Sequence, residues 1–75
     1  MKLSELNKGD KAIIVYINCE NTLKNRFYSF GITKNSIITV EEVTLTKSTI
    51  EIKIKNTKVA LRLSEASQIE VNYAN

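Results

Sequence analysis

The sequence predicts a small, mainly β protein with five strands and one short helix. Its 75 residues include ten isoleucines, five valines and seven threonines, which is far more β-branched side chains than a helical bundle favours. Apolar residues recur at every second position in several short stretches, as they do in strands with one buried face. A chain of this length forms at most one domain, residues 1–75, and its core is small.

The N-terminal segment is expected to contain a turn followed by the first strand. Leu3 and Leu6 are three residues apart and can share one side of a helical turn. The run from Lys11 to Asn18 is apolar at nearly every position, which predicts a strand that is covered on both faces.

One short helix is expected from Thr22 to Phe30. Asn21 or Thr22 can cap its first turn, because either side chain can accept a hydrogen bond from the free backbone amides there. Gly31 follows at once and can adopt the left-handed conformation that ends a helix. One narrow stripe of the helix is apolar and should face the core: Leu23, Phe27 and Phe30.

A β-hairpin is expected in the middle of the chain. Its first strand runs from Ile37 to about Leu45, and the parity of its apolar positions changes at Glu41-Glu42, which is typical of a β-bulge. The loop is Thr46-Lys47-Ser48. The next strand alternates cleanly, with inward Ile50, Ile52 and Ile54 and outward Glu51, Lys53 and Lys55.

The last third of the chain reads as two strands separated by a small polar insert. The apolar positions of these strands are Val59, Leu61 and Leu63, then Ile69, Val71 and Tyr73. Between them, Ser64 can cap a 3₁₀ turn, and Glu65 suits the positive end of a helix dipole. We expect this turn to redirect the last strand so that the sheet closes into a barrel and loses its edges. This order of elements predicts a five-stranded SH3-like barrel with one α-helix after the first strand and a 3₁₀ turn before the last.

Composition excludes several classes of function. The chain has no histidine and a single aspartate, Asp10, so the usual catalytic triads and dyads are unavailable, and we predict that it is not an enzyme. The carboxylates are dispersed, and Cys19-Glu20 is the only thiolate–carboxylate neighbour pair, so we expect no metal site and no cofactor. A lone cysteine, a polar N-terminal segment and the lack of a long apolar run predict a cytoplasmic protein.

Three stretches of the chain are similar to one known family. They are "LSELNKGDKAIIV", "LKNRFYSFGIT" and "ALRLSEASQIEV", of which the last is the most specific. Together they resemble the ferrous iron transport protein A (FeoA) family, the small cytoplasmic partners of a bacterial ferrous-iron permease. The resemblance implies an accessory role in iron uptake through protein binding, with the permease's cytoplasmic GTP-binding domain as the partner and the membrane reached only through the permease.

The chain departs from the family's pattern at three turns. It has Lys34-Asn35 where the family usually has Pro-Gly, Thr46 to Thr49 where a Gly-Asp-Pro hairpin is common, and Asn56-Thr57 where a glycine is common. These positions alter the shape of loops more than the core.

The candidate partner-binding residues lie on the helix and on the fourth strand. Tyr28 lies about 140° from Leu23 around the helix, away from the apolar stripe, and Lys24 and Arg26 flank it. An exposed tyrosine between two cations is a plausible docking patch, although Tyr28 could equally cover an edge of the barrel. Arg62 points away from the core, where it either contacts a partner or pairs with a nearby glutamate.

Two other functions remain open from the sequence. Lys47, Lys53, Lys55 and Lys58 cluster around one hairpin and could track phosphates, but no aromatic residues are interleaved with them and the net charge is only +3. We therefore expect no nucleic-acid partner. The SH3-like barrel also occurs in iron-dependent repressors, so a stand-alone regulatory domain is the other alternative. The sequence also leaves open whether the domain forms a homodimer.

Overall fold

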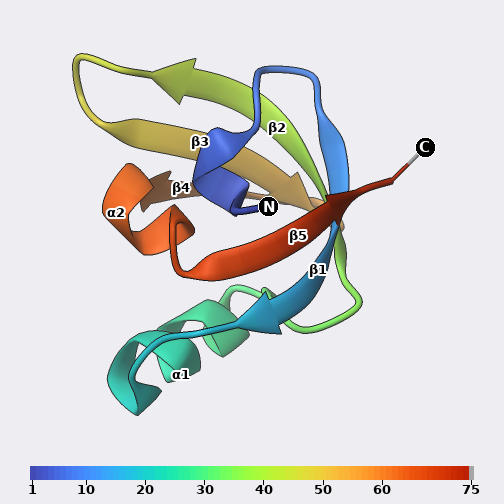
Figure 1. Ribbon diagram of the computed structural model, residues 1–75, viewed down its shortest axis with the longest axis vertical. Helices are drawn as coiled ribbons and strands as arrows, with labels where there is room; N and C mark the ends of the chain where they lie inside the picture. The colour runs from blue at the N-terminus through green and yellow to red at the C-terminus, as the bar shows by residue number, and fades with distance from the viewer. Residues whose placement is uncertain (75) are drawn as a thin grey trace.

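Five antiparallel strands form one curled sheet in the computed structural model, which describes residues 1–74 (Figure 1). The strands are β1 (Lys11–Ile17), β2 (Ile37–Thr44), β3 (Thr49–Ile54), β4 (Thr57–Arg62) and β5 (Ile69–Tyr73). Three short helices accompany them: the 3₁₀ helix η1 (Leu3–Glu5), α1 (Asn21–Ser29) and α2 (Leu63–Ala66). The predicted class, strand number and helix position are confirmed.

The sheet stays open, so the expected closure of a barrel is wrong. Its strand order is β4-β3-β2-β1-β5, which leaves β4 and β5 as edges that do not pair with each other. η1 and α2 lie between these edges and cover the core there (Figure 1). The outer edge of β5 is partly occupied, because the amide of Val71 donates to the carbonyl of Met1 at 2.7 Å. η1 and α2 therefore cover the core at this end of the sheet, where hydrogen bonds between β4 and β5 would otherwise close a barrel.

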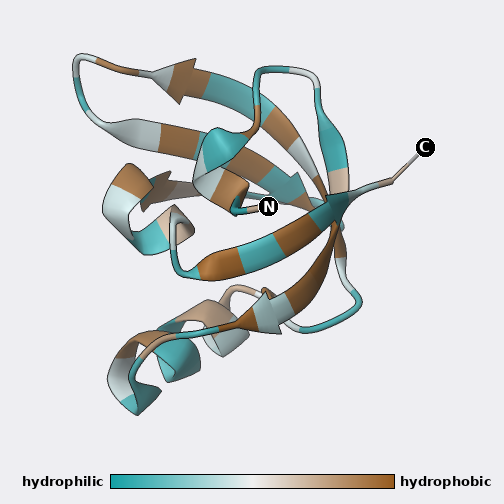
Figure 2. Cartoon of the chain, viewed as in Figure 1, coloured by the Kyte–Doolittle hydropathy of each residue, from teal (hydrophilic) through white to brown (hydrophobic). Residues whose placement is uncertain are grey.

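The core is aliphatic apart from one aromatic side chain, Phe27. Apolar and polar residues alternate along the strands, as the bands of colour in Figure 2 show. The inward residues predicted for the last three strands are buried: Ile50, Ile52, Ile54, Val59, Leu61, Ile69 and Val71. Three residues predicted to lie in strands with their side chains in the core do not do so. Leu63 begins α2 and is half-buried, and Leu45 lies in the hairpin loop with 76% of its surface exposed. Tyr73 lies in β5 but is 53% exposed.

β1 is covered on one face, not on both as predicted. Ala12, Ile14 and Ile17 are buried, whereas the residues between them are half-buried or exposed. The register of β1 against β5 shifts between Ile14 and Tyr16, and this bulge turns Tyr16 outward and Ile17 inward. The bulge predicted in β2 is also present, as a register shift between Val40 and Glu42.

α1 begins and ends close to the predicted positions. Neither Asn21 nor Thr22 caps it, because Asn21 is already the first helical residue and Glu20 before it makes no side-chain cap. At the other end Gly31 has φ +84°, and the amide of Ile32 donates to the carbonyl of Phe27 at 2.9 Å. These are the features of a Schellman stop, and Ile32 is fully buried beside it.

α2 is a single α-helical turn and not the predicted 3₁₀ turn. The amide of Ser67 donates to the carbonyl of Leu63, four residues earlier, at 2.9 Å. Ser64 lies inside the turn and does not cap it. The amide of Arg62 is satisfied instead by Oε1 of Glu65 at 3.0 Å, as in one half of a capping box.

Candidate functional site

A surface hollow lies between the end of β1 and one face of α1, two elements that are neighbours in Figure 1. Its volume is about 220 Å³, and it is lined by Tyr16, Ile17, Lys24, Tyr28 and Lys34. Ile17 belongs to the core and forms the apolar base, while Tyr16 and Tyr28 expose 57% and 49% of their surfaces. We call this site the tyrosine–lysine hollow. It combines two phenol rings and two ammonium groups on one surface.

Local backbone geometry places each side chain of the hollow. The β1 bulge turns Tyr16 outward. Lys24 and Tyr28 are four residues apart in α1 and therefore lie one above the other on the same face. Lys34 lies in the loop to β2, and that loop is tied to β1 because the amide of Asn35 donates to the carbonyl of Ile14 at 2.7 Å.

The two lysines of the hollow are unpaired cations. Neither Lys24 nor Lys34 forms an ion pair with any acidic group of residues 1–74. Lys24 is half-buried, so its methylene stem covers apolar surface while its ammonium group remains available. Burial raises the pKa of the Cys19 thiol above its ordinary value, which the charge of Lys24 opposes and Glu20 reinforces. Cys19 is therefore a neutral thiol at pH 7 and offers no thiolate to the site.

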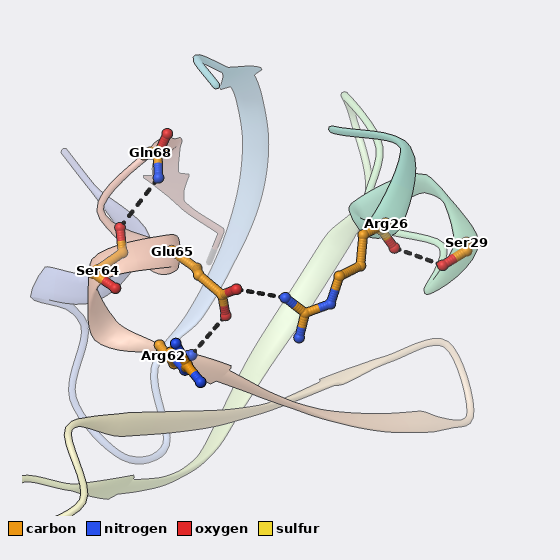
Figure 3. Close-up of polar contacts among 6 residues, drawn as sticks. All are labelled: Arg26, Ser29, Arg62, Ser64, Glu65 and Gln68. Atoms are coloured by element: carbon orange, nitrogen blue, oxygen red, sulfur yellow. Dashed lines mark hydrogen bonds and ion pairs between the residues drawn. The ribbon is translucent and has the colours of Figure 1, made fainter. Parts of the chain in front are cut away.

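Arg26 points to Glu65 of α2 (Figure 3) and does not line the hollow. Its guanidinium forms an ion pair with Glu65 and lies 5.7 Å from the centre of the Phe30 ring. Burial alone would raise the pKa of Glu65, but the hydrogen bonds from the Arg62 amide and from Arg26, together with the charge of Arg26, lower it below its ordinary value. Glu65 is thus an ionised group that joins α1, α2 and the end of β4.

The structure brings together two of the four residues proposed from the sequence. Lys24 and Tyr28 share the hollow, whereas Arg26 faces α2. Arg62 is exposed at the end of β4, and its side chain makes no ion pair within residues 1–74, so the expected pairing with a glutamate is absent there. A role for any of the four in partner binding stays a prediction.

Sequence reasoning missed Tyr16 and Lys34 as members of the site. The signal for Lys34 was its place three residues after the glycine that ends α1, since the chain must return past the helix there. Tyr16 gave no such signal, because the bulge that exposes it is hidden in a continuous apolar run. The hairpin lysines do not join the site: none of them lines the hollow, and Lys58 pairs with Glu41 at 3.7 Å.

The described residues contain neither a cluster of metal ligands nor a helix that could span a membrane. Within residues 1–74, no three acidic or cysteine side chains come together as ligands for a metal ion. None of the helices formed by these residues is both long enough and apolar enough to cross a membrane. The chemistry available at the hollow is recognition by charge and by aromatic contact.

The chain is similar to named iron-transport proteins over almost its whole length. The profile of the FeoA domain matches residues 1–73. A Campylobacter jejuni protein, described as a candidate Fe(2+) transport protein A, is 44% identical over 96% of this chain and 97% of its own. A Porphyromonas gingivalis protein, named an Fe(2+) transport protein A/Fe(2+) transporter FeoB fusion, is 32% identical over 95% of this chain and 8% of its own.

Solved structures share the fold. A crystal structure of an iron uptake regulatory protein (FeoA) superposes with a TM-score of 0.88 at 27% identity, over 99% of this chain and 96% of that one. A manganese-dependent transcriptional repressor superposes with a TM-score of 0.93 at 23% identity, over 97% of this chain and 40% of the repressor. The second likeness concerns the fold alone. Together they confirm the SH3-like class.

Proposed function

The chain belongs to the FeoA family, and from this premise we propose that it is a small single-domain accessory protein of bacterial ferrous-iron uptake. It acts in the cytoplasm by binding the ferrous-iron permease at that protein's cytoplasmic GTP-binding domain. One observation carries the proposal: in the Porphyromonas gingivalis relative, a segment similar to this chain is part of one polypeptide with a FeoB transporter. Fusion holds two proteins at high effective concentration, which is useful when they work in contact.

Binding is the mode of action that we propose, because the chain has no histidine and a single aspartate with which to build a catalytic site. A protein that binds one conformation of a GTP-binding domain more tightly than another shifts the population toward it. The size of that shift is set by the ratio of the two affinities. Regulation therefore requires that binding differ between nucleotide states.

The exposed face of α1 is the surface that we propose for this contact. Lys24 and Tyr28 lie on it, and the unpaired ammonium group and half-exposed ring give it both charge and contact area. Arg26 is less available, because it is paired with Glu65 of α2. Arg62 is exposed but lies beside α2 at the end of β4, and it does not line the hollow.

Binding to the intact permease tests the proposal. The cognate permease, reconstituted in lipid nanodiscs, is titrated with the full chain in the presence of GTP, GDP or no nucleotide. We expect saturable binding whose Kd differs between nucleotide states, and a changed rate of ferrous-iron uptake in cells that lack the chain. Absence of binding in all three states would overturn the proposal.

A further inference from the structure

We propose that the tyrosine–lysine hollow binds an acidic segment of the permease's cytoplasmic domain, with a carboxylate held between Lys24 and Lys34 and the adjoining side chain against the rings of Tyr16 and Tyr28. This inference rests on the proposed function and adds the chemistry of the contact to it. Three properties of the hollow lead to this occupant: its charge, its aromatic walls and its size.

The charge of the hollow is complementary to an anion. Both of its lysines lack an acidic partner within residues 1–74, as do most basic residues of the described chain, and what sets these two apart is that they line the same hollow. A carboxylate bound between their ammonium groups would be attracted by both charges. Glu70 of β5 is the register partner of Tyr16 on the neighbouring strand. Its carboxylate forms an ion pair with the amino group of Met1 at 3.5 Å.

The aromatic walls favour a protein partner. Tyr16 and Tyr28 come from different elements, and each keeps about half of its surface exposed beside the buried Ile17. Tyrosine gives a large contact area for little loss of side-chain entropy, because it has two rotatable bonds, and it is enriched at protein interfaces. Leu45 is exposed alone in its hairpin loop. The rings of Tyr16 and Tyr28 line one hollow and can contact the same side chain of a partner.

The size of the hollow selects a side chain over a free metabolite. Sites for drug-sized ligands and cofactors measure about 300–1,000 Å³ and enclose most of the ligand. The hollow measures about 220 Å³ and is open to solvent, which suits one or two side chains presented by a protein surface.

The same hollow is a poor platform for a nucleic acid strand. Such a strand needs a groove of cations that follows its backbone over several nucleotides. The four lysines of the β2–β3–β4 hairpins do not line the hollow, so the hollow itself offers only two cations, Lys24 and Lys34.

Charge reversal at the hollow tests the inference. The double variant Lys24→Glu/Lys34→Glu is compared with a matched control, Lys47→Glu/Lys53→Glu, which makes the same change of net charge at exposed lysines outside the hollow. Binding to the nanodisc-embedded permease is measured for both at low and moderate salt. We expect the hollow variant to bind about tenfold or more weakly and to lose most of the salt dependence, and the control to stay within about threefold of wild type. Lys24→Arg/Lys34→Arg should keep most of the affinity.

The aromatic part is tested by Tyr16→Ala and Tyr28→Ala, with Tyr73→Ala as the control for loss of an exposed tyrosine. Each hollow variant should weaken binding about fivefold or more, because tyrosines near the centre of an interface are enriched among the residues whose truncation weakens binding most. Thermal unfolding verifies that each variant is folded.

The outcomes separate the inference from the function on which it rests. If wild type binds the permease and the hollow variants bind as tightly as their controls, the inference fails and the proposed function stands. If wild type does not bind the permease, both fail. If single-stranded DNA or RNA, but not the permease, binds wild type and is lost in the hollow variants, the acidic segment is the wrong occupant.

Discussion

The two α-helices of this protein, α1 and α2, make opposite use of their residues. α2 has four residues, yet the side chain of Gln68 donates to the carbonyl of Ser64 (Figure 3). The hydroxyl of Ser67 donates to the same carbonyl, and Ala66 is fully buried. α1 has nine residues and a single fully buried side chain, Phe27. The short helix is committed to holding the fold, whereas the long one keeps most of its side chains free.

This difference separates the residues that identify the family from those that we propose for binding. The motif "ALRLSEASQIEV" is the most specific of the three resemblances, and it contains β4's end, α2 and most of β5. Four of its apolar residues are buried in the core, and Glu65 satisfies the amide of Arg62. The buried residues are Leu61, Ala66, Ile69 and Val71. This motif therefore indicates the fold, and the binding surface that we propose lies on other elements, α1 and the end of β1.

The two helices are nevertheless joined through one ion pair. Arg26 of α1 and Glu65 of α2 are 39 residues apart in the sequence. Since α1 is anchored to the core mainly by Phe27, this pair is a second point that fixes the helix relative to the sheet. Removal of the core anchor Phe27 and removal of the ion pair between Arg26 and Glu65 therefore test separately what holds α1 in place.

Removal of the core anchor should have the largest effect on stability. Phe27→Ala leaves a cavity under α1, and we expect the free energy of unfolding to fall by about 3–5 kcal/mol in urea denaturation. That is a large part of the stability of so small a domain. The matched control is Tyr28→Ala on the same helix, which should change stability by less than about 0.5 kcal/mol because Tyr28 is half-exposed.

Phe27→Leu, which keeps most of the volume, should lose less and permits measurement if the alanine variant does not fold. Equal losses at positions 27 and 28 would contradict the asymmetry of the helix.

Removal of the ion pair should have a smaller and pH-dependent effect. Glu65→Gln keeps an acceptor for the amide of Arg62 but loses the charge that pairs with Arg26. Because the pKa of Glu65 is lowered on folding, its ionised form stabilises the protein above the ordinary value of 4.5, and this contribution is lost as the pH falls through the lower pKa of the folded state. We expect a difference from wild type below about 1 kcal/mol near neutral pH, since Arg26 is half-exposed, shrinking below pH 4.5.

Glu5→Gln is the control for this experiment. Glu5 accepts a hydrogen bond from the amide of Lys2 at 2.6 Å at the start of η1, just as Glu65 accepts one from the amide of Arg62 at the start of α2. Among the described residues, no arginine forms an ion pair with Glu5. A Glu65→Gln effect that is the same at pH 7 and pH 3 would show that the ion pair contributes nothing.

The fold was largely predictable because its signals are local. The alternation in β3 and the apolar stripe ending at Gly31 each depend on neighbouring residues, and both predictions are confirmed. The errors came where distant segments decide the outcome. Closure of the sheet depends on whether β4 meets β5, and coverage of the outer face of β1 depends on what lies beside it. Leu63 continues the strand pattern, but the backbone already turns there because Glu65 holds the amide of Arg62.

The candidate site was predictable only in part for the same reason. The helical period placed Lys24 and Tyr28 on one face, since they are four residues apart. It could not show that Arg26 would find Glu65, or that a bulge would bring Tyr16 to the same hollow. A surface assembled from three segments carries no spacing that a single sequence reveals.

Hydrogen exchange of the chain with and without the nanodisc-embedded permease is the most direct test of binding at the tyrosine–lysine hollow. One experiment reports on both the hollow and α2. We predict that amide exchange slows at the end of β1 and through α1 to Lys34 when the permease binds, while exchange in α2 and the adjoining end of β4 stays unchanged. The strongest protection in α2 and β4, with exchange around the hollow unaffected, would contradict the account.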